Sequence, residues 1–206
     1  MPHSDAVGTS IVAVVLAAGE ARRFGSAKQA AVVDGRSLVQ HAVDAAAGGG
    51  ADEVIVVLGA RAEVVASALT LPPSARMVVN PDFAAGQSTS LRAGVRAAGD
   101  AVAVVVLLAD QPGVTAGDVR AVLDGHRATG APLVRASYRG TPGHPVLLGR
   151  ELFPEVIDAT GDVGARDVLA RHVEQVVEVA IDRDPPGDVD TPGDLAAAGG
   201  HTPPGP

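Results

Sequence analysis

Short apolar runs that alternate with alanine-rich stretches constrain the fold of this chain more than any other feature of its sequence. The apolar runs have the length of strands, and the stretches between them carry apolar residues at helical spacing. Strands are predicted at 11–17, 53–58, 76–79, 101–109, 133–137, 145–148 and 176–181, and helices at 37–47, 62–69, 88–98, 115–128 and 163–171. Such alternation is typical of a mostly parallel sheet with helices on both faces. We therefore predict an α/β fold in which the most hydrophobic run, 101–109, is central.

The length and composition indicate one domain without disulfides. The 206 residues suffice for a single domain, which we place at 1–198, and the Gly- and Pro-rich residues 199–206 are predicted to be a disordered tail. The absence of cysteine excludes disulfides, iron–sulfur clusters and thiolate chemistry. Because the chain shows neither a signal-peptide pattern nor an apolar run long enough for a bilayer, we expect a soluble, cytoplasmic protein with no membrane partner.

The charge and the aromatic content argue against nucleic acid as a partner. The net charge is -8 at pH 7, and aromatic residues make up 2% of the chain. Surfaces that bind nucleic acid are usually basic, and those that bind single strands also present rings on which bases stack. An anionic small-molecule substrate would have to be met by a few local cations, by helix N-termini and by a metal ion.

Polar residues follow three of the predicted strands at the point where each strand ends. They are the loop after Ala17, the loop after Val79, and Asp110. Ligands of such sheets bind outside the carboxyl ends of the strands. We expect these three segments to converge on one crevice.

Lys28 is the only lysine of the chain, and it closes the loop that follows the first predicted strand. A lysine ammonium binds phosphate as a point charge, whereas the alternative is an ordinary solvated surface lysine. We favour phosphate binding, because the backbone of Leu16, Ala17, Ala18 and Gly19 can approach a ligand closely and Arg23 adds a second cation. The loop matches neither a Walker A motif nor a dinucleotide fingerprint.

Six segments, in order, resemble those of the MobA-like nucleotidyltransferases, which are related to the enzymes that mature the molybdenum cofactor. They are LAAGEARRFGSAK (16–28), NPDFAAGQSTSLRAG (80–94), LLADQP (107–112), RGTPGHPVL (139–147), GDVGAR (161–166) and DVDTPGDL (188–195). The LAAG and DQP segments look most like the molybdenum cofactor cytidylyltransferase branch, which has relatives named nicotine blue oxidoreductase. The resemblance implies a Rossmann-like sheet of the nucleotide-diphospho-sugar transferase type.

The resemblance also implies a reaction, in which a phosphate of molybdopterin attacks the α-phosphorus of CTP and pyrophosphate leaves. Both reactants are anions, so a divalent cation such as Mg²⁺ is expected as the cofactor. We assign Asp110 and Asp190 as its ligands and treat Asp188 as a weaker candidate. Lys28, Arg23 and Asp110 are the predicted catalytic residues. The alternative for each aspartate is a helix cap or a turn, and Asp194 competes for that role.

The remaining candidate residues each have a structural alternative. Gly86, Ser88 and Ser90 precede or open a helix and are assigned to nucleotide binding, or else they only cap the helix. Asn80 is assigned to the base or ribose, or else to an Asn-Pro turn. The predicted contacts to the pterin or its phosphate are His144, Asp162 and Arg166, or else these order a loop and cap a helix.

One departure from the family pattern keeps two other functions open. Ala21 stands where the family usually has a serine, so a hydroxyl that could bind phosphate is missing. The second hypothesis is a nicotine blue oxidoreductase-like enzyme that uses NAD(P)H, and the third is a non-catalytic chaperone that passes nucleotide or pterin to a molybdoenzyme. A molybdoenzyme is therefore a candidate protein partner.

Overall fold

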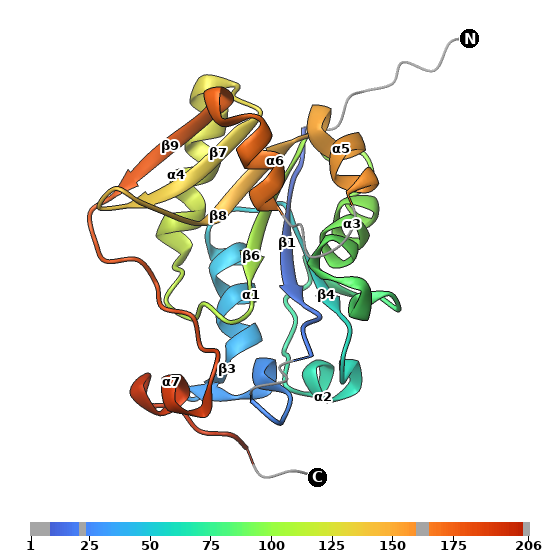
Figure 1. Cartoon of the computed structure of the whole chain (residues 1–206), viewed down its shortest axis with the longest axis vertical. Coiled ribbons are helices and arrows are strands. Elements are labelled where there is room, and N and C mark those ends of the chain that lie inside the picture. Colours follow the sequence, from blue (N-terminus) through green and yellow to red (C-terminus); the bar gives the residue numbers. More distant parts are fainter. Residues whose placement is uncertain (1–8, 21–23, 160–164, 204–206) are drawn as a thin grey trace.

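The computed structural model describes residues 9–20, 24–159 and 165–203, and within them one sheet of seven strands forms the centre of the molecule (Figure 1). Its order is β5-β4-β1-β6-β8-β7-β9. The strands are β1 (Ile11–Ala17), β4 (Glu53–Leu58), β5 (Ala75–Val79), β6 (Ala103–Leu108), β7 (Leu133–Tyr138), β8 (Thr141–Gly149) and β9 (Val176–Ile181). Only β8 runs antiparallel to its neighbours in this sheet. The mostly parallel sheet is confirmed, and β6 is its central strand.

Helices cover both faces of the sheet and make two apolar layers (Figure 1). On one face lie α1 (Leu38–Gly48), α2 (Ala62–Ser67) and α4 (Ala116–Thr129), and on the other α3 (Gln87–Ala97), α5 (Phe153–Asp158) and α6 (Ala165–Arg171). Along β1 the side chains alternate between the layers, with Ala13 and Val15 in the first and Val12 and Val14 in the second. An unbroken apolar strand is therefore what a sheet covered on both faces requires.

Hydroxyl side chains cap the first turns of α1 and α4, which pack on the same face of the sheet. The Ser37 hydroxyl accepts a hydrogen bond from the backbone N–H of Gln40 at the start of α1. At α4, the Thr115 hydroxyl accepts from the Asp118 backbone N–H while the Asp118 carboxylate accepts from the Thr115 N–H. These caps fix the direction in which each helix leaves the sheet.

A small second core joins the C-terminal segment to the region after β1. It packs short elements together: the 3-10 turn η1 (Lys28–Ala30), the hairpin of β2 (Val32–Val33) and β3 (Arg36–Ser37), and α7 (Pro192–Ala197). Its buried residues are Phe24, Ala31, Val33, Leu38, Val189 and Leu195. Figure 1 shows α7 beside β3, at the end of the molecule toward which β1 points. The C-terminal segment thus meets the segment that follows β1, next to the carboxyl ends of the parallel strands.

Residues 199–203 differ from the predicted disordered tail. The backbone of His201 pairs with Val32 in both directions, with N···O distances of 2.8 Å. A side chain on Gly200 would place its Cβ 2.5 Å from the Val32 carbonyl oxygen. The small residue that suggested disorder is what allows the chain to pack here. Among the helices of the described residues, none combines the length and apolar character needed to cross a membrane.

Candidate active site

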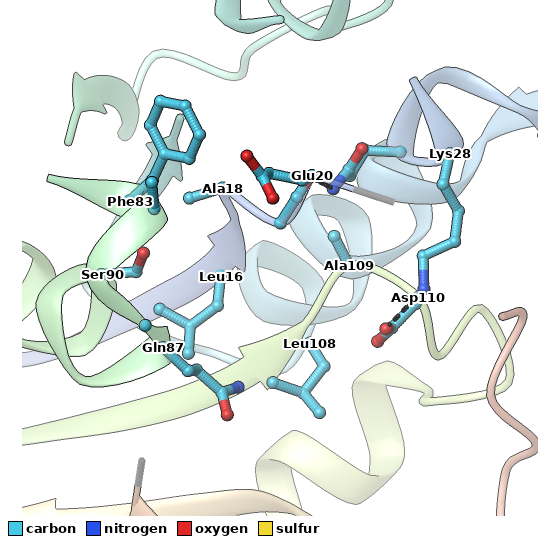
Figure 2. A pocket seen from close by; sticks show the side chains of 14 residues that line it. Leu16, Ala18, Glu20, Lys28, Phe83, Gln87, Ser90, Leu108, Ala109 and Asp110 are labelled. Carbon is cyan, nitrogen blue, oxygen red and sulfur yellow. Dashed lines mark hydrogen bonds and ion pairs between the residues drawn. The ribbon is translucent and has the colours of Figure 1, made fainter. Parts of the chain in front are cut away.

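The polar segments after β1, β5 and β6 converge, as predicted, on a cavity of about 500 Å³ (Figure 2). Its walls come from the end of β1 and η1, from the turn and helix start that follow β5, and from the end of β6. The lining residues are Leu16, Ala18, Gly19, Glu20, Lys28, Gln29, Phe83, Ala84, Gly86, Gln87, Ser90, Leu108, Ala109 and Asp110. Figure 2 shows Phe83 and Ser90 on one side of this cavity and Lys28 with Asp110 on the other. We refer to it below as the first cavity.

Lys28 is buried at 8% exposure and bridges two carboxylates. Its ammonium lies 3.0 Å from Asp110 Oδ2 and 2.9 Å from Asp190 Oδ1. Burial alone would lower the pKa of Lys28, but the two carboxylates outweigh that effect and raise the pKa above its ordinary value. The lysine is therefore a charged group of the site and not a solvated surface residue.

The fold brings these three residues together from distant parts of the sequence. Asp110 follows the end of β6, where the Ala109 N–H donates to the Leu16 carbonyl across the parallel strands. The Val189 N–H donates to the Asp110 carbonyl at 2.9 Å, and the buried Val189 side chain anchors this segment in the small second core. Asp190 is thereby held beside Asp110.

The neighbouring aspartates, Asp188 and Asp194, have other partners than Lys28. Asp188 accepts a hydrogen bond from the Gln111 amide at 2.7 Å. Asp194 accepts from the Thr191 hydroxyl and from the backbone N–H groups of Thr191 and Asp190 as part of the α7 capping box. These hydrogen bonds, that of the Thr191 hydroxyl first, lower the pKa of Asp194. Asp190 alone of the three contacts Lys28.

The described walls of the first cavity carry more negative than positive charge. Lys28 is the one cation among the described lining residues, against Glu20 and Asp110, with Asp190 adjoining. A triphosphate would meet net repulsion here unless a cation accompanied it. Two carboxylates facing one point are an oxygen donor set of the size that Mg²⁺ uses together with substrate phosphates. Among the described residues there is no cluster of three or more His, Cys, Asp or Glu side chains that could hold a metal ion without other ligands.

Comparison with known proteins places the chain in a family. The sequence profile of the MobA-like NTP transferase domain matches residues 13–176. The chain belongs to this family of nucleotidyltransferases.

Relatives of this MobA-like chain cover nearly its whole length. It is 35% identical to nicotine blue oxidoreductase of Paenarthrobacter nicotinovorans over 190 residues, which are 88% of this chain and 92% of that protein. The crystal structure of Rv0371c from Mycobacterium tuberculosis H37Rv matches with a TM-score of 0.81 at 32% identity, covering 92% of this chain and 97% of that one. The complex of Rv0371c with manganese matches with a TM-score of 0.77 at 30% identity, covering 92% and 98% of the two chains.

In this MobA-like chain the end of β1 approaches the first cavity mainly through backbone and small side chains. Leu16, Ala18 and Gly19 line the cavity, whereas Ala17 is buried in the core at 1% exposure and is not among the lining residues. The Gln29 amide donates to the Gly19 carbonyl at 2.9 Å and holds the loop against η1.

Close approach of β4 to this loop depends on Gly59. A Cβ there would lie 2.7 Å from Ala18 Cβ and from Phe83 Cβ. The loops after β1 and β5 therefore converge around a position that admits no side chain.

Of the four residues after β5 that the sequence assigns to nucleotide binding, two line the first cavity and two do not. Gly86 and Ser90 line the first cavity as expected, but Ser88 is 1% exposed and is not among the lining residues. Asn80 is also buried, and its amide donates to Thr89 and Ser90 while its carbonyl accepts from the Asp82 N–H. Asn80 thus has the turn-forming role given as its alternative. It is a fixed part of the scaffold because all of these bonds hold the loop to the helix.

Sequence reasoning missed Phe83, Gln87 and Leu108, which also line the first cavity. None of them carries a charge that would single it out. Gln87 lies one residue before the predicted helix 88–98, whereas its neighbour Ser88 is among the residues assigned to nucleotide binding. Arg23, Asp162 and the side chain of Arg166 lie outside the described part of the structure.

His144 lies in a second cavity of about 370 Å³ that shares Leu108 with the first. Its other lining residues are Gln111, Arg135, Pro142, Gly143, Val146, Ala165, Leu169, Pro185, Pro186 and Asp188. The buried Tyr138 hydroxyl donates to the His144 carbonyl at 2.7 Å and fixes the backbone there. Burial raises the pKa of Tyr138, so this hydroxyl stays protonated as the donor.

Proposed function

We propose that this chain is a Mg²⁺-dependent nucleotidyltransferase that transfers CMP from CTP to molybdopterin and releases pyrophosphate. The observation that carries the proposal is the cluster of Lys28, Asp110 and Asp190 beside a cavity at the carboxyl ends of β1 and β6. The MobA-like family supports the class of reaction. The pyrimidine base and the pterin acceptor come from the sequence resemblance.

The first cavity suits the nucleotide in size and in the arrangement of its walls. In the proposed complex the base lies on the side of Phe83, which offers a ring face, and the triphosphate extends toward Lys28. The Lys28 ammonium screens phosphate charge, and backbone N–H groups at the start of α3 favour an anion nearby. We assign no contact to the base or ribose to Asn80.

Asp110 and Asp190 are the proposed ligands of Mg²⁺, and the chain supplies only carboxylate oxygens there. A divalent cation would offset the repulsion between the two phosphate groups that react. The manganese complex of Rv0371c supports a divalent metal in this branch of the family.

The proposed acceptor site is the second cavity, with His144 in its wall. A phosphate oxygen of the acceptor attacks the α-phosphorus of CTP, the bond from that phosphorus to the bridging oxygen of the β-phosphate breaks, and pyrophosphate leaves. The attacking phosphate is already ionised, so no general base is required. Catalysis comes from two effects: the substrates are positioned on either side of Leu108, and the charge of their phosphates is screened.

The test is release of pyrophosphate from CTP, Mg²⁺ and molybdopterin, compared with GTP and ATP. Lys28→Ala and Asp110→Asn should each lower the rate by on the order of 10²-fold or more, because each group acts on developing charge. Asp124→Asn is the matched control, since Asp124 is exposed on α4 and pairs only locally with Arg127 at 3.1 Å. A folded protein that releases no pyrophosphate with any of these nucleotides would contradict the proposal.

The same preparation should be assayed for oxidation of NAD(P)H with a dye acceptor, because the relative from Paenarthrobacter nicotinovorans is named an oxidoreductase. Oxidation without pyrophosphate release would replace the transferase with the second hypothesis. Binding of CTP without turnover, including in an Ala21→Ser variant, would favour the chaperone.

A further inference from the structure

The two proposed metal ligands already share a cation in this structure, and that cation is Lys28. Asp110 Oδ2 and Asp190 Oδ1 lie 3.0 Å and 2.9 Å from the same ammonium. The lysine side chain is 10% exposed, whereas the side chains of Asp110 and Asp190 are 29% and 50% exposed. The carboxylates are therefore open to solvent cations, but the point that both of them face is taken by the ammonium.

A divalent cation cannot bridge Asp110 Oδ2 and Asp190 Oδ1 while the ammonium stays between these two oxygens. Both cations would compete for the same carboxylate oxygens, and at such short range they would repel each other strongly. A metal that bridges these two oxygens must therefore displace the Lys28 ammonium. The displaced ammonium needs another anion, because the Lys28 side chain is buried and an unpaired charge there would be costly.

The first cavity offers a place for that anion. Lys28 lines the cavity together with Gly19 and the start of α3, which is where the proposed function puts the triphosphate. The backbone of η1 is fixed, because the Ala31 N–H donates to the Lys28 carbonyl and Gln29 holds Gly19. The flexible four-carbon side chain of Lys28 is therefore what turns from the carboxylates to a phosphate.

We infer that Lys28 is a built-in counter-ion that blocks the metal ligands until a nucleoside triphosphate draws its ammonium away. This inference rests on the proposed function, because it takes the triphosphate site from there. Its consequence is that metal and nucleotide bind cooperatively, each raising the affinity of the other by the same factor. Without nucleotide the native protein should bind a divalent metal weakly.

The decisive experiment measures Mn²⁺ binding, by the electron paramagnetic resonance signal of the free ion, and needs no turnover. Lys28→Met keeps the apolar side chain and removes the charge, so it should bind Mn²⁺ at least about tenfold tighter than the native protein when nucleotide is absent. Addition of the α,β-methylene analogue of CTP should strengthen Mn²⁺ binding in the native protein by more than in Lys28→Met. Titration of Mn²⁺ with the analogue alone corrects for chelation in solution.

Two controls assign any change to these residues. Arg127→Met removes an exposed cation from α4 and should leave Mn²⁺ affinity unchanged. Lys28→Met combined with Asp110→Asn should lose the gain, because the freed ligand pair is broken. Should Lys28→Met unfold, as judged by circular dichroism, Lys28→Gln replaces it in the same comparison.

The outcomes separate this inference from the proposed function. Mn²⁺ affinity in Lys28→Met that equals or falls below that of the native protein would overturn the inference, even if the native protein releases pyrophosphate. Tighter Mn²⁺ binding in Lys28→Met would support it, even if the CTP and molybdopterin assay fails.

Discussion

Asp188, Asp190 and Asp194 have the same side-chain chemistry but three different partners. Asp188 accepts from Gln111, Asp190 binds the Lys28 ammonium, and Asp194 caps α7. Which role each acid takes depends on where the backbone places it. The capping box turns Asp194 back toward Thr191, and the anchored Val189 leaves Asp190 in contact with the Lys28 ammonium.

Asp190→Asn and Asp194→Ala should therefore have separable effects. Asp190→Asn should lower metal-dependent pyrophosphate release by on the order of 10²-fold and leave the urea midpoint nearly unchanged. Asp194→Ala should lower that midpoint, because the α7 cap is lost.

The pH dependence of stability offers a second check on Asp194. Because its folded pKa is depressed, its stabilisation is present above the unfolded pKa near 3.8 and is lost as pH falls through the lower folded value. The destabilisation caused by Asp194→Ala should therefore be full at pH 7 and should shrink below pH 3.8. A stable but fully active Asp190→Asn, or an Asp194→Ala whose deficit is independent of pH, would contradict these roles.

At the level of single residues, Lys28 and Asp110 could be predicted from the sequence, whereas Glu20, Phe83 and Leu108 could not. Lys28 and Asp110 were found because one is the only lysine and the other ends a wholly apolar strand. The sequence does not show that Ser90 lines the cavity and Ser88 does not. Successive side chains of a helix point in different directions, and the sequence does not determine the residue at which α3 begins. Phe83 and Leu108 line the cavity with side chains that look like ordinary core residues in the sequence.

Some helices and strands are determined by their own local sequence, whereas others depend on contacts with distant parts of the chain. The bounds of β1, β4 and β9 agree with the prediction residue for residue, because short runs rich in β-branched apolar residues define them locally. The hairpin of β2 and β3 is not among the predicted elements, and a helix at the position of α7 is given only through the alternative, helix-capping role of Asp190 and Asp194. The hairpin and α7 are short, and they are held by residues from the other end of the chain in the small second core.

Removal of residues 199–206 tests how much the backbone pairing of His201 with Val32 contributes to the free energy of unfolding. A chain that ends at Ala198 loses the two backbone hydrogen bonds between Val32 and His201, so its free energy of unfolding should fall by about 1–3 kcal/mol. Pyrophosphate release should also fall, because the same packing holds Asp190. A chain that ends at Pro203 keeps both hydrogen bonds and is the matched control. Equal urea midpoints for the two truncations would show that the contact contributes nothing.

At the scale of the whole molecule, the site forms because the C-terminal segment with Asp190 packs against the segment that follows β1. Lys28 is separated from Asp110 by 82 residues and from Asp190 by 162. The first two are joined by the parallel pairing of β1 with β6, which the strand–helix alternation predicts. Asp190 joins them through the packing of Val189 and Leu195, a contact that local sequence patterns do not encode.

The net charge of -8 gives the molecule a field that opposes its proposed anionic substrate. Long-range repulsion slows the approach of an anion at low salt, and it is screened as the Debye length falls from about 30 Å at 0.01 M to about 10 Å at 0.1 M. The association rate of a fluorescent CTP analogue, measured by stopped flow at fixed Mg²⁺, should therefore rise with KCl over this range. Electrostatically steered binding would show the opposite trend. A rate that falls steeply with salt would mean that local cations near the first cavity dominate the field of the whole molecule, and that the substrate is attracted before Lys28 is reached.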